Sequence, residues 1–235
     1  MDFSRRAYLS ELMDQPCTYG ELRDCLRDLE RVNKVTFAYR PTLLWLQHLA
    51  RTSSGSRPLH IVDVGSGGGD MLRRLERWGN SRQIELKLTG IDLNPFAVQA
   101  AKRKTTKNSR IRWIAGNAYS FDHISEPIDA VISSLFTHHL EDAEIARFLG
   151  WMESVSQRGW FINDLSRGPK SYFAFKALAA IFNWHHFVKH DGPVSIRRAF
   201  QREDWERYAQ DAGLPLDVLR IESRWPGRLT VARFK

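Results

Sequence analysis

Cysteine is scarce in this chain, and long apolar runs are missing. Cys17 and Cys25 are the only cysteines among 235 residues, and one helical segment can carry both. Neither a disulfide framework nor a four-ligand zinc site can therefore be argued, and we interpret both as reduced packing residues. No apolar run reaches the roughly 20 residues of a membrane-spanning helix, and the polar residues 1–6 lack a signal-peptide core. We expect a cytoplasmic protein with one main α/β domain.

Acidic residues are outnumbered by basic ones, which gives a net charge of +8. A positive balance can indicate an anionic partner such as nucleic acid or acidic lipid, or simply a solvated basic surface. The densest basic run, residues 102–112, falls where a helix is expected to end, and cations are favourable at a helix C-terminus. We favour this structural interpretation, which makes nucleic acid an unlikely partner.

Four closely spaced glycines, at position 65 and at positions 67–69, follow the first predicted strand, residues 59–64. Gly65, Gly67 and Gly69 let the backbone turn tightly and approach a ligand before a helix that starts near Met71. The N-terminus of that helix offers free N–H groups and a partial positive charge, which suit a carboxylate or a phosphate. This stretch predicts a nucleotide-type loop.

A second predicted strand, residues 85–92, ends on a carboxylate. Asp92 lies about 20 residues past the glycines, where an acid can accept hydrogen bonds from both ribose hydroxyls. Asp92 could instead cap the helix that begins near Pro95, but Asn94 is the better cap. The two motifs together predict a nucleoside site.

Strands and helices alternate regularly after residue 59, which is typical of βαβ units and a parallel sheet. The predicted strands are 59–64, 85–92, 111–115, 128–134 and 160–164, and the predicted helices are 69–79, 95–105, 141–157 and 201–212. The chain is expected to end in a hairpin that spans residues 216–234 and turns at 225–228, so its last strand is antiparallel.

Two segments fall outside this alternation. Residues 1–55 are expected to be a mostly helical arm or lid, with helices at 19–29 and 42–50 and a linker at 52–56. Residues 166–200 are an insertion at the carboxyl end of a strand, where a long connection usually covers a binding crevice. The expected division is thus 1–55 as the arm and 56–235 as the core, with 166–200 as a lid.

The spacing Gly65-x-Gly67-x-Gly69 after an acidic strand end, together with Asp92 and the closing hairpin, resembles the class I S-adenosylmethionine-dependent methyltransferases. The dinucleotide fingerprint would instead need glycine where Asp70 stands. The resemblance implies a seven-stranded Rossmann-like sheet, mostly parallel with the last strand antiparallel, and S-adenosyl-L-methionine as cofactor. It implies that the cofactor is bound by Asp63, Gly65, Ser66, Gly67, Gly69, Asp92, Leu93, Asn117, Ala118 and Ser133. Many relatives have an aspartate where Asn117 stands, so that contact depends on how its amide is oriented.

Residues 133–140, Ser-Ser-Leu-Phe-Thr-His-His-Leu, resemble the small-molecule branch of that family. They lack the Asn/Asp-Pro-Pro-aromatic tetrapeptide of enzymes that methylate exocyclic amines of bases. His139 is the first candidate for a general base or substrate orienter and His138 the second, because imidazole titrates near neutral pH, although either can be a packing residue.

The predicted lid carries further candidates: His185, His186 and His190 can contact substrate, and the aromatic run 172–182 can line an apolar pocket or belong to the core. No carboxylate or cysteine stands at matching spacing from the histidines, so we expect no metal. Arg197 and Arg198 can clamp an acidic substrate group or pair with a local carboxylate such as Asp191.

The resemblance extends to enzymes that O-methylate quinone precursors and aromatic or polyketide-derived rings. It implies methyl transfer to a hydroxyl of a small, planar, partly apolar substrate. Two alternatives stay open: a methyltransferase of RNA or protein, favoured by the basic balance, and a nicotinamide-dependent oxidoreductase, which shares the strand–glycine–acid pattern. The oligomeric state is not determined by the sequence.

Overall fold

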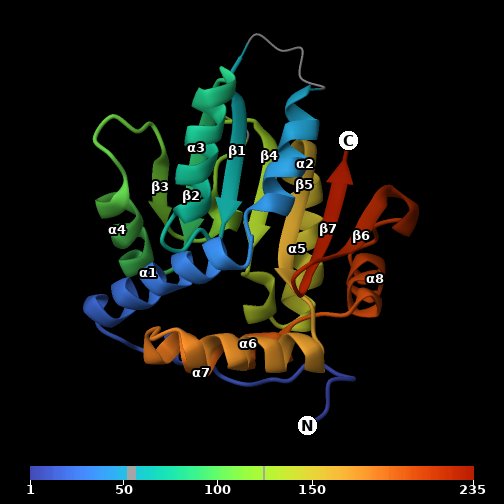
Figure 1. Ribbon diagram of the computed structural model, residues 1–235. Coiled ribbons are helices and arrows are strands. Elements are labelled where there is room, and N and C mark those ends of the chain that lie inside the picture. Colours follow the sequence, from blue (N-terminus) through green and yellow to red (C-terminus); the bar gives the residue numbers. More distant parts are fainter. Residues whose placement is uncertain (52–56, 124) are drawn as a thin grey trace.

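The computed structural model describes residues 1–51, 57–123 and 125–235. Within these ranges the strands form one seven-stranded sheet in the order β3-β2-β1-β4-β5-β7-β6 (Figure 1). The strands are β1(Leu59–Val64), β2(Leu86–Asp92), β3(Arg112–Ala115), β4(Ile128–Ser134), β5(Ser156–Leu165), β6(Leu219–Arg224) and β7(Arg228–Phe234). Only β7 runs antiparallel to its neighbours, β5 and β6. The predicted Rossmann-like methyltransferase sheet with its antiparallel last strand is confirmed.

Helices cover both faces of the sheet (Figure 1). They are α1(Tyr19–Val35), α2(Arg40–Arg51), α3(Asp70–Arg82), α4(Pro95–Lys104), α5(Asp142–Val155), α6(Pro169–Ile181), α7(His186–Arg198) and α8(Arg202–Asp211). Short 3₁₀ turns are η1(Leu12–Asp14), η2(Ala118–Ser120), η3(Thr137–His139) and η4(Leu216–Val218). Side chains of α2, α3 and α4 build the core on one face, and those of α5 and α8 build it on the other. Because both faces are covered, central strands such as β1 are buried along their whole length.

Several boundaries differ from the sequence prediction. β5 begins at Ser156, where the sequence predicted that a helix continues to residue 157. In the predicted helical arm, α1 and α2 lie where helices were expected, whereas residues 1–18 are irregular apart from η1. No apolar period organises this segment, and hydrogen bonds from Arg6 and Arg167 tie it to the rest of the molecule. The predicted linker 52–56 and the boundary between 55 and 56 lie outside the described residues.

The insertion after β5 folds as a pair of helices, α6 and α7, that lies at the carboxyl edge of the sheet together with α1 and the N-terminal segment (Figure 1). The two helices approach closely at Gly192, where an added Cβ would lie 2.0 Å from the Phe175 ring. The sequence left open whether the aromatic run 172–182 lines a pocket or belongs to the core, and its residues are divided between these environments. Tyr172 is buried and Phe175 lines the central cavity, whereas Phe173 is exposed.

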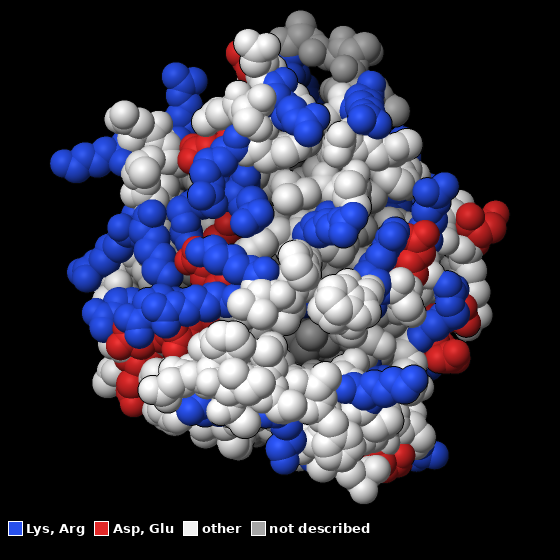
Figure 2. Space-filling model, in the orientation of Figure 1, with Lys and Arg blue, Asp and Glu red and all other residues white. Residues whose placement is uncertain are grey.

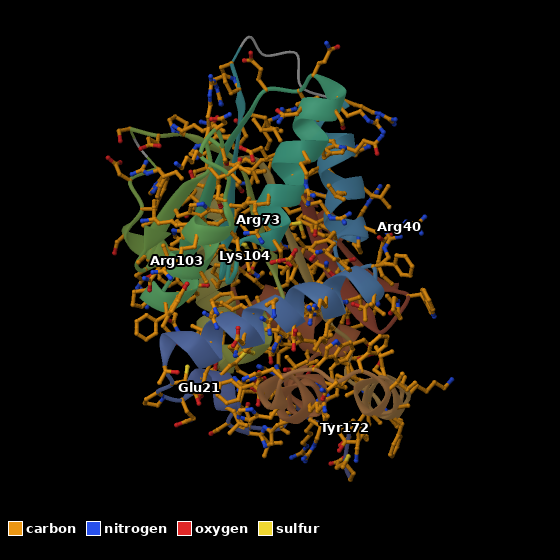
Figure 3. All side chains as sticks on the ribbon, turned by 60° about the vertical axis from the view of Figure 1, so that its left-hand side comes forward. Glu21, Arg40, Arg73, Arg103, Lys104 and Tyr172 are labelled. Atoms are coloured by element: carbon orange, nitrogen blue, oxygen red, sulfur yellow. The ribbon has the colours of Figure 1, made fainter. Side chains whose placement is uncertain are left out.

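Lysine and arginine side chains crowd the surface over α1 and α4 (Figures 2 and 3). Several are paired within the chain: Glu30 lies 3.3 Å from both Arg73 and Lys104, and Arg103 stacks 5.0 Å from the Tyr19 ring centroid. These contacts favour the structural interpretation of the basic run. None of the helices in the described ranges has the length and apolar character needed to cross a lipid bilayer.

Candidate functional site

A cavity of about 1680 Å³ opens at the carboxyl ends of β1, β2 and β4 and is closed by α1, α6 and α7. Ligand pockets are typically about 300–1,000 Å³, so this cavity has room for more than one small molecule. In the space-filling view a hollow surrounded mostly by uncharged atoms lies above α6 (Figure 2). The cavity lies where parallel sheets of this topology bind their ligands.

The glycine loop forms one wall of the cavity. Gly65 and Gly67 have φ angles of 71° and 50°, and a Cβ at Gly65 would lie 2.5 Å from the Phe136 ring. The N–H groups of Gly65 and Ser66 donate to the carbonyl oxygen of Ile91, which fixes the loop against β2. The buried hydroxyl of Ser66 has no hydrogen-bond partner within the described ranges. The loop therefore leaves a narrow space beside the unpaired Ser66 hydroxyl, and a ligand bound there would supply its hydrogen-bond partner.

Two carboxylates belong to this wall: that of Asp63 is buried, and that of Asp92 is partly buried. Asp92 accepts from the N–H groups of Gly67 at 2.7 Å and Asn94 at 2.9 Å, while Asn94 caps α4 as predicted. Burial raises the pKa of Asp92, and these hydrogen bonds act against the rise. Burial also raises the pKa of Asp63 well above its ordinary value, and the charges of Asp70 and Asp92 raise it further. A cationic ligand bound beside these groups would stabilise the charged form of both carboxylates.

The remaining predicted cofactor residues divide into two groups. Leu93, Asn117 and Ala118 line the cavity, and the side-chain amide oxygen Oδ1 of Asn117 caps η2 by accepting from the Tyr119 N–H. Gly69 and Ser133 lie outside the cavity lining. A Cβ at Gly69 would lie 2.3 Å from Trp113, and the Ser133 hydroxyl donates to the carbonyl oxygen of Val64.

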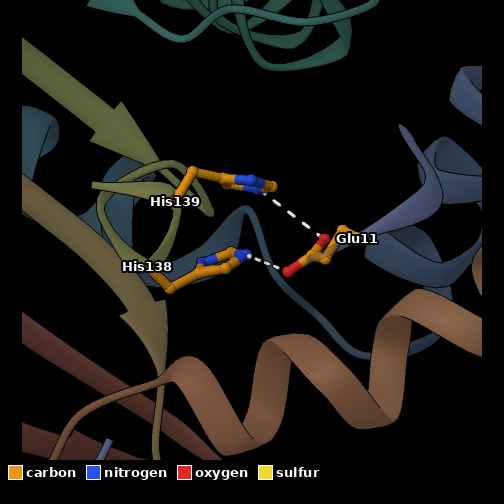
Figure 4. Close-up of side chains that lie close together, drawn as sticks. All are labelled: Glu11, His138 and His139. Carbon is orange, nitrogen blue, oxygen red and sulfur yellow. Dashed lines mark ion pairs between the residues drawn. The ribbon is translucent and has the colours of Figure 1, made fainter. Parts of the chain in front are cut away.

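The predicted histidines lie side by side in η3, and both line the cavity. His138 Nδ1 lies 2.7 Å from the carboxylate of Asp164 at the end of β5, and His139 Nδ1 lies 3.1 Å from the carboxylate of Asp14. Both rings extend toward Glu11 (Figure 4). His138 Nε2 is 3.8 Å and His139 Nε2 is 3.9 Å from the nearest carboxylate oxygen of Glu11.

Two of these carboxylates have opposite pKa shifts. Burial raises the pKa of Glu11 to about 7, although His139 and Arg198 act against the rise. Burial also acts to raise the pKa of Asp164, but the neighbouring His138, Thr137 and Leu165 donors outweigh it and hold that pKa well below its usual range. Asp164 is therefore a fixed negative partner for His138.

Packing against α7 holds the N-terminal turn η1 in place. The Asp191 carboxylate accepts from the N–H groups of Leu12 at 2.8 Å and Met13 at 3.0 Å. The Ser195 hydroxyl lies 2.9 Å from Glu11 Oε1. Asp191 thus orients the segment that carries Glu11 and Asp14.

Of the two roles considered for Arg198, the structure shows pairing with a carboxylate, although the partner is Asp14 and not Asp191. Arg198 lies 3.2 Å from Asp14 and donates to the carbonyl oxygen of His138, so it supports the histidine turn. Neither Arg197 nor Arg198 lines the cavity. The lining includes Arg228 of β7, which is 4% exposed and whose Nε and Nη1 have no hydrogen-bond partner within the ranges that the structure describes. Burial lowers the pKa of Arg228 to about 10.

Of the other lid histidines, neither His185, His186 nor His190 belongs to the cavity lining. His185 caps α7, and His190 lies 2.7 Å from Asp191. Cys17 and Cys25 are free, and both line the cavity on the side of α1.

Sequence reasoning missed the acidic partners Glu11, Asp14 and Asp164. Asp164 ends a predicted strand in the same way as Asp63 and Asp92, so that signal could have found it. Glu11 and Asp14 lie in an extended segment without periodicity, and only the tertiary structure brings them to residues more than a hundred positions away.

Residues 61–159 match the family model described as "Methyltransferase domain". This segment contains the glycine loop, both acidic strand ends and the two histidines. Among curated proteins, none matches the chain.

Solved structures share the fold. The plantazolicin methyltransferase BpumL, in complex with a triazolic desmethylPZN analog and SAH, has 12% identity and a TM-score of 0.63 over 89% of this chain and 90% of that one. Human N-acetylserotonin methyltransferase in complex with SAM has 14% identity and a TM-score of 0.61 over 93% of this chain and 56% of that one. A putative O-methyltransferase from Nostoc punctiforme has 17% identity and a TM-score of 0.62 over 98% of this chain and 64% of that one.

Residues 61–159 therefore form a methyltransferase domain, and similar solved structures contain SAM or SAH.

Proposed function

We propose that this enzyme methylates a hydroxyl group of a small, largely apolar acceptor of aromatic or polyketide-like character. The single observation that carries the proposal is the polar end of an otherwise mostly apolar cavity, where Glu11, His138 and His139 converge. Two of the similar structures are named as an O-methyltransferase and as the methyltransferase of N-acetylserotonin, which is compatible with a small acceptor.

The cofactor would occupy the wall formed by the glycine loop and the acidic strand ends. Asp92 is placed for the ribose hydroxyls, and the Ser66 hydroxyl and Asp63 for the methionine part. Leu93, Asn117 and Ala118 would border the adenine. The negative charge of Asp63 and Asp92 would stabilise a ligand that carries an ammonium and a sulfonium group. Gly69 and Ser133 would act indirectly, by allowing Trp113 to pack and by joining β4 to β1.

The acceptor would enter past an apolar rim. Val35, Phe37 and Trp225 are exposed there, and Phe37 and Trp225 lie 6.2 Å apart between ring centroids. The unpaired Nε and Nη1 of Arg228 would take an oxygen of the acceptor, because a buried guanidinium with unpaired donors is costly until a ligand satisfies them. Residues 1–55 and 166–200 would together act as the lid of this site.

The histidine end of the cavity would bind the acceptor hydroxyl and take its proton. S-Adenosylmethionine supplies the methyl group: the acceptor oxygen bonds to the methyl carbon while the carbon–sulfur bond breaks and leaves its electron pair on sulfur. The hydroxyl proton would pass to His139 Nε2, with Asp14 orienting the ring through Nδ1, and His138 would hold the oxygen in line.

Side-by-side titration with S-adenosylmethionine and NADH tests the cofactor site. We expect the wild-type protein to bind S-adenosylmethionine, and Asp92→Ala to weaken that binding by about 10- to 100-fold, because hydrogen bonds to a charged group are worth about 1.5–3 kcal/mol. Asp217→Asn, at an exposed position, serves as the control. Tighter binding of NADH would contradict the proposal.

Methylation of a panel of phenols, quinols and polyketide-like hydroxy compounds tests the acceptor site. His139→Ala should leave S-adenosylmethionine affinity unchanged and lower turnover by about 100-fold or more, as expected on loss of a general base. Unchanged turnover would remove His139 from the reaction. Product only with RNA or protein would overturn the small-molecule assignment.

A further inference from the structure

Glu11, His138 and His139 form a cluster whose geometry the methyl-transfer reaction does not by itself explain. One ligand-type atom from each residue lies within 4.8 Å of the others (Figure 4). Glu11 and His138 are almost fully buried, and His139 is partly buried. The two imidazole rings are tilted by 36° with their centroids 4.3 Å apart, and both Nε2 atoms lie within 4 Å of the Glu11 carboxylate.

Both Nε2 atoms are available in this arrangement. The Nδ1 atom of His138 is engaged by Asp164 and that of His139 by Asp14. Because Nδ1–H donates to a carboxylate, the neutral imidazole carries its lone pair on Nε2. The 3.8 and 3.9 Å separations from Glu11 are too long for hydrogen bonds. Within the described ranges, no hydrogen bond engages either Nε2 atom.

Separations of this size suit a third atom held between the groups. Zinc binds imidazole nitrogen and carboxylate oxygen at about 2.0–2.2 Å, so ligand atoms around a tetrahedral ion lie about 3.4 Å apart. The two separations between the histidines and Glu11 would have to shorten by about half an ångström to reach that spacing.

The outer contacts are those of a metal site. Metal-binding histidines usually donate their second N–H to a carboxylate or carbonyl, and here both do so. The Ser195 hydroxyl lies 2.9 Å from Glu11 and fixes the third ligand. Arg198 lies 3.7 Å from Glu11 and 3.2 Å from Asp14, so these two carboxylates share one neighbouring cation.

We propose that Glu11, His138 and His139 bind one divalent transition-metal ion, with Zn²⁺ as the reference ion, at the acceptor end of the cavity. Two imidazoles and one carboxylate leave a coordination position open toward the cavity. Its place beside the acceptor rests on the proposed function. A hydroxyl bound at that position would release its proton to water more readily. With His139 Nε2 bound to the ion, this step would replace the proton transfer to His139 that applies to the metal-free protein.

Zinc titration of the chelator-treated full-length protein tests the binding itself, without acceptor. We expect one Zn²⁺ per chain, and Co²⁺ at the same site should give a visible spectrum typical of nitrogen and oxygen ligands. Glu11→Gln and His139→Asn should each weaken Zn²⁺ binding by about 100-fold or more, and Asp14→Asn by about 10- to 100-fold. His186→Gln, which changes an exposed histidine outside the cluster, should bind as the wild type does.

Equal Zn²⁺ affinity in the wild type, Glu11→Gln and His139→Asn would overturn the proposal, as would the absence of binding in a folded wild type. S-Adenosylmethionine binding and the thermal midpoint of each variant report whether it is folded. A wild type that binds Zn²⁺ but methylates no small hydroxyl compound would contradict the proposed function and leave the metal site standing. A folded wild type that methylates small hydroxyl compounds but binds no Zn²⁺ would support the proposed function and overturn the metal site.

Discussion

Asp63 shows how a buried residue can oppose stability while it serves binding. Its carboxyl is 2% exposed, and burial raises its pKa with a further contribution from Asp70 and Asp92. A carboxyl whose pKa is raised on folding binds more protons in the folded state than in the unfolded state. Asp63 therefore makes the free protein less stable as the pH rises from about 4, the ordinary pKa of aspartate, through its raised folded-state value.

Asp63→Asn should remove this pH dependence. We expect the free energy of unfolding of the variant, relative to the wild type, to rise between pH 4 and pH 8 in the absence of cofactor. Its S-adenosylmethionine affinity should fall, because a negative charge is lost beside a cationic ligand. Urea denaturation across this pH range, with Asp217→Asn as a surface control, measures the effect. Parallel stability curves for Asp63→Asn and wild type would contradict the assignment.

At the scale of elements, the strands and most helices follow from local patterns. Continuous apolar runs predict β1 and β4 because these strands are buried on both faces. Asn94 and Pro95 predict the start of α4. The segment before α1 is different: it has no period of its own, and its extended course depends on partners such as Asp191 and Arg198.

The pairing of α6 and α7 depends on one small residue. A Cβ at Gly192 would lie 2.0 Å from Phe175, whereas a Cβ at Gly150 in α5 would meet nothing within 4 Å. Gly192→Ala should lower the free energy of unfolding by about 1–3 kcal/mol, the usual cost of overpacking. Gly150→Ala should be neutral or stabilise by up to about 1 kcal/mol, because alanine has the higher helix propensity. Thermal unfolding of the pair measures this contrast, and equal midpoints would contradict it.

At the scale of the whole molecule, Arg6 joins the N-terminal segment to three distant elements. Its guanidinium lies 2.6 Å from Asp142 of α5 and donates to the carbonyl oxygens of His138 and Arg198. The same group stacks 4.6 Å from the Phe200 ring centroid. The contacts of Arg6 thus fix the position of the N-terminal segment that places Glu11 beside His138 and His139.

Arg6→Ala should lower the free energy of unfolding by about 2 kcal/mol or more, because several carbonyl and carboxylate groups lose a charged donor. It should also weaken Zn²⁺ binding and turnover, while S-adenosylmethionine affinity stays near the wild-type value. Arg5→Ala is the matched control, since Arg5 is the adjacent arginine and is exposed. Similar losses in both variants would show that the effect is one of charge and not of these contacts.

The sequence by itself determined the sheet, the glycine loop and the acidic ends of β1 and β2, because these features depend on residues that are neighbours along the chain or repeat with the period of a strand. Only the tertiary structure decided that Glu11 and Asp14 meet His138 and His139, that Arg228 rather than Arg197 or Arg198 lines the cavity, and that Arg198 pairs with Asp14. Such contacts join residues far apart in the chain, where no local pattern records the partner, and they exist because burial brings charged groups together where they must be paired.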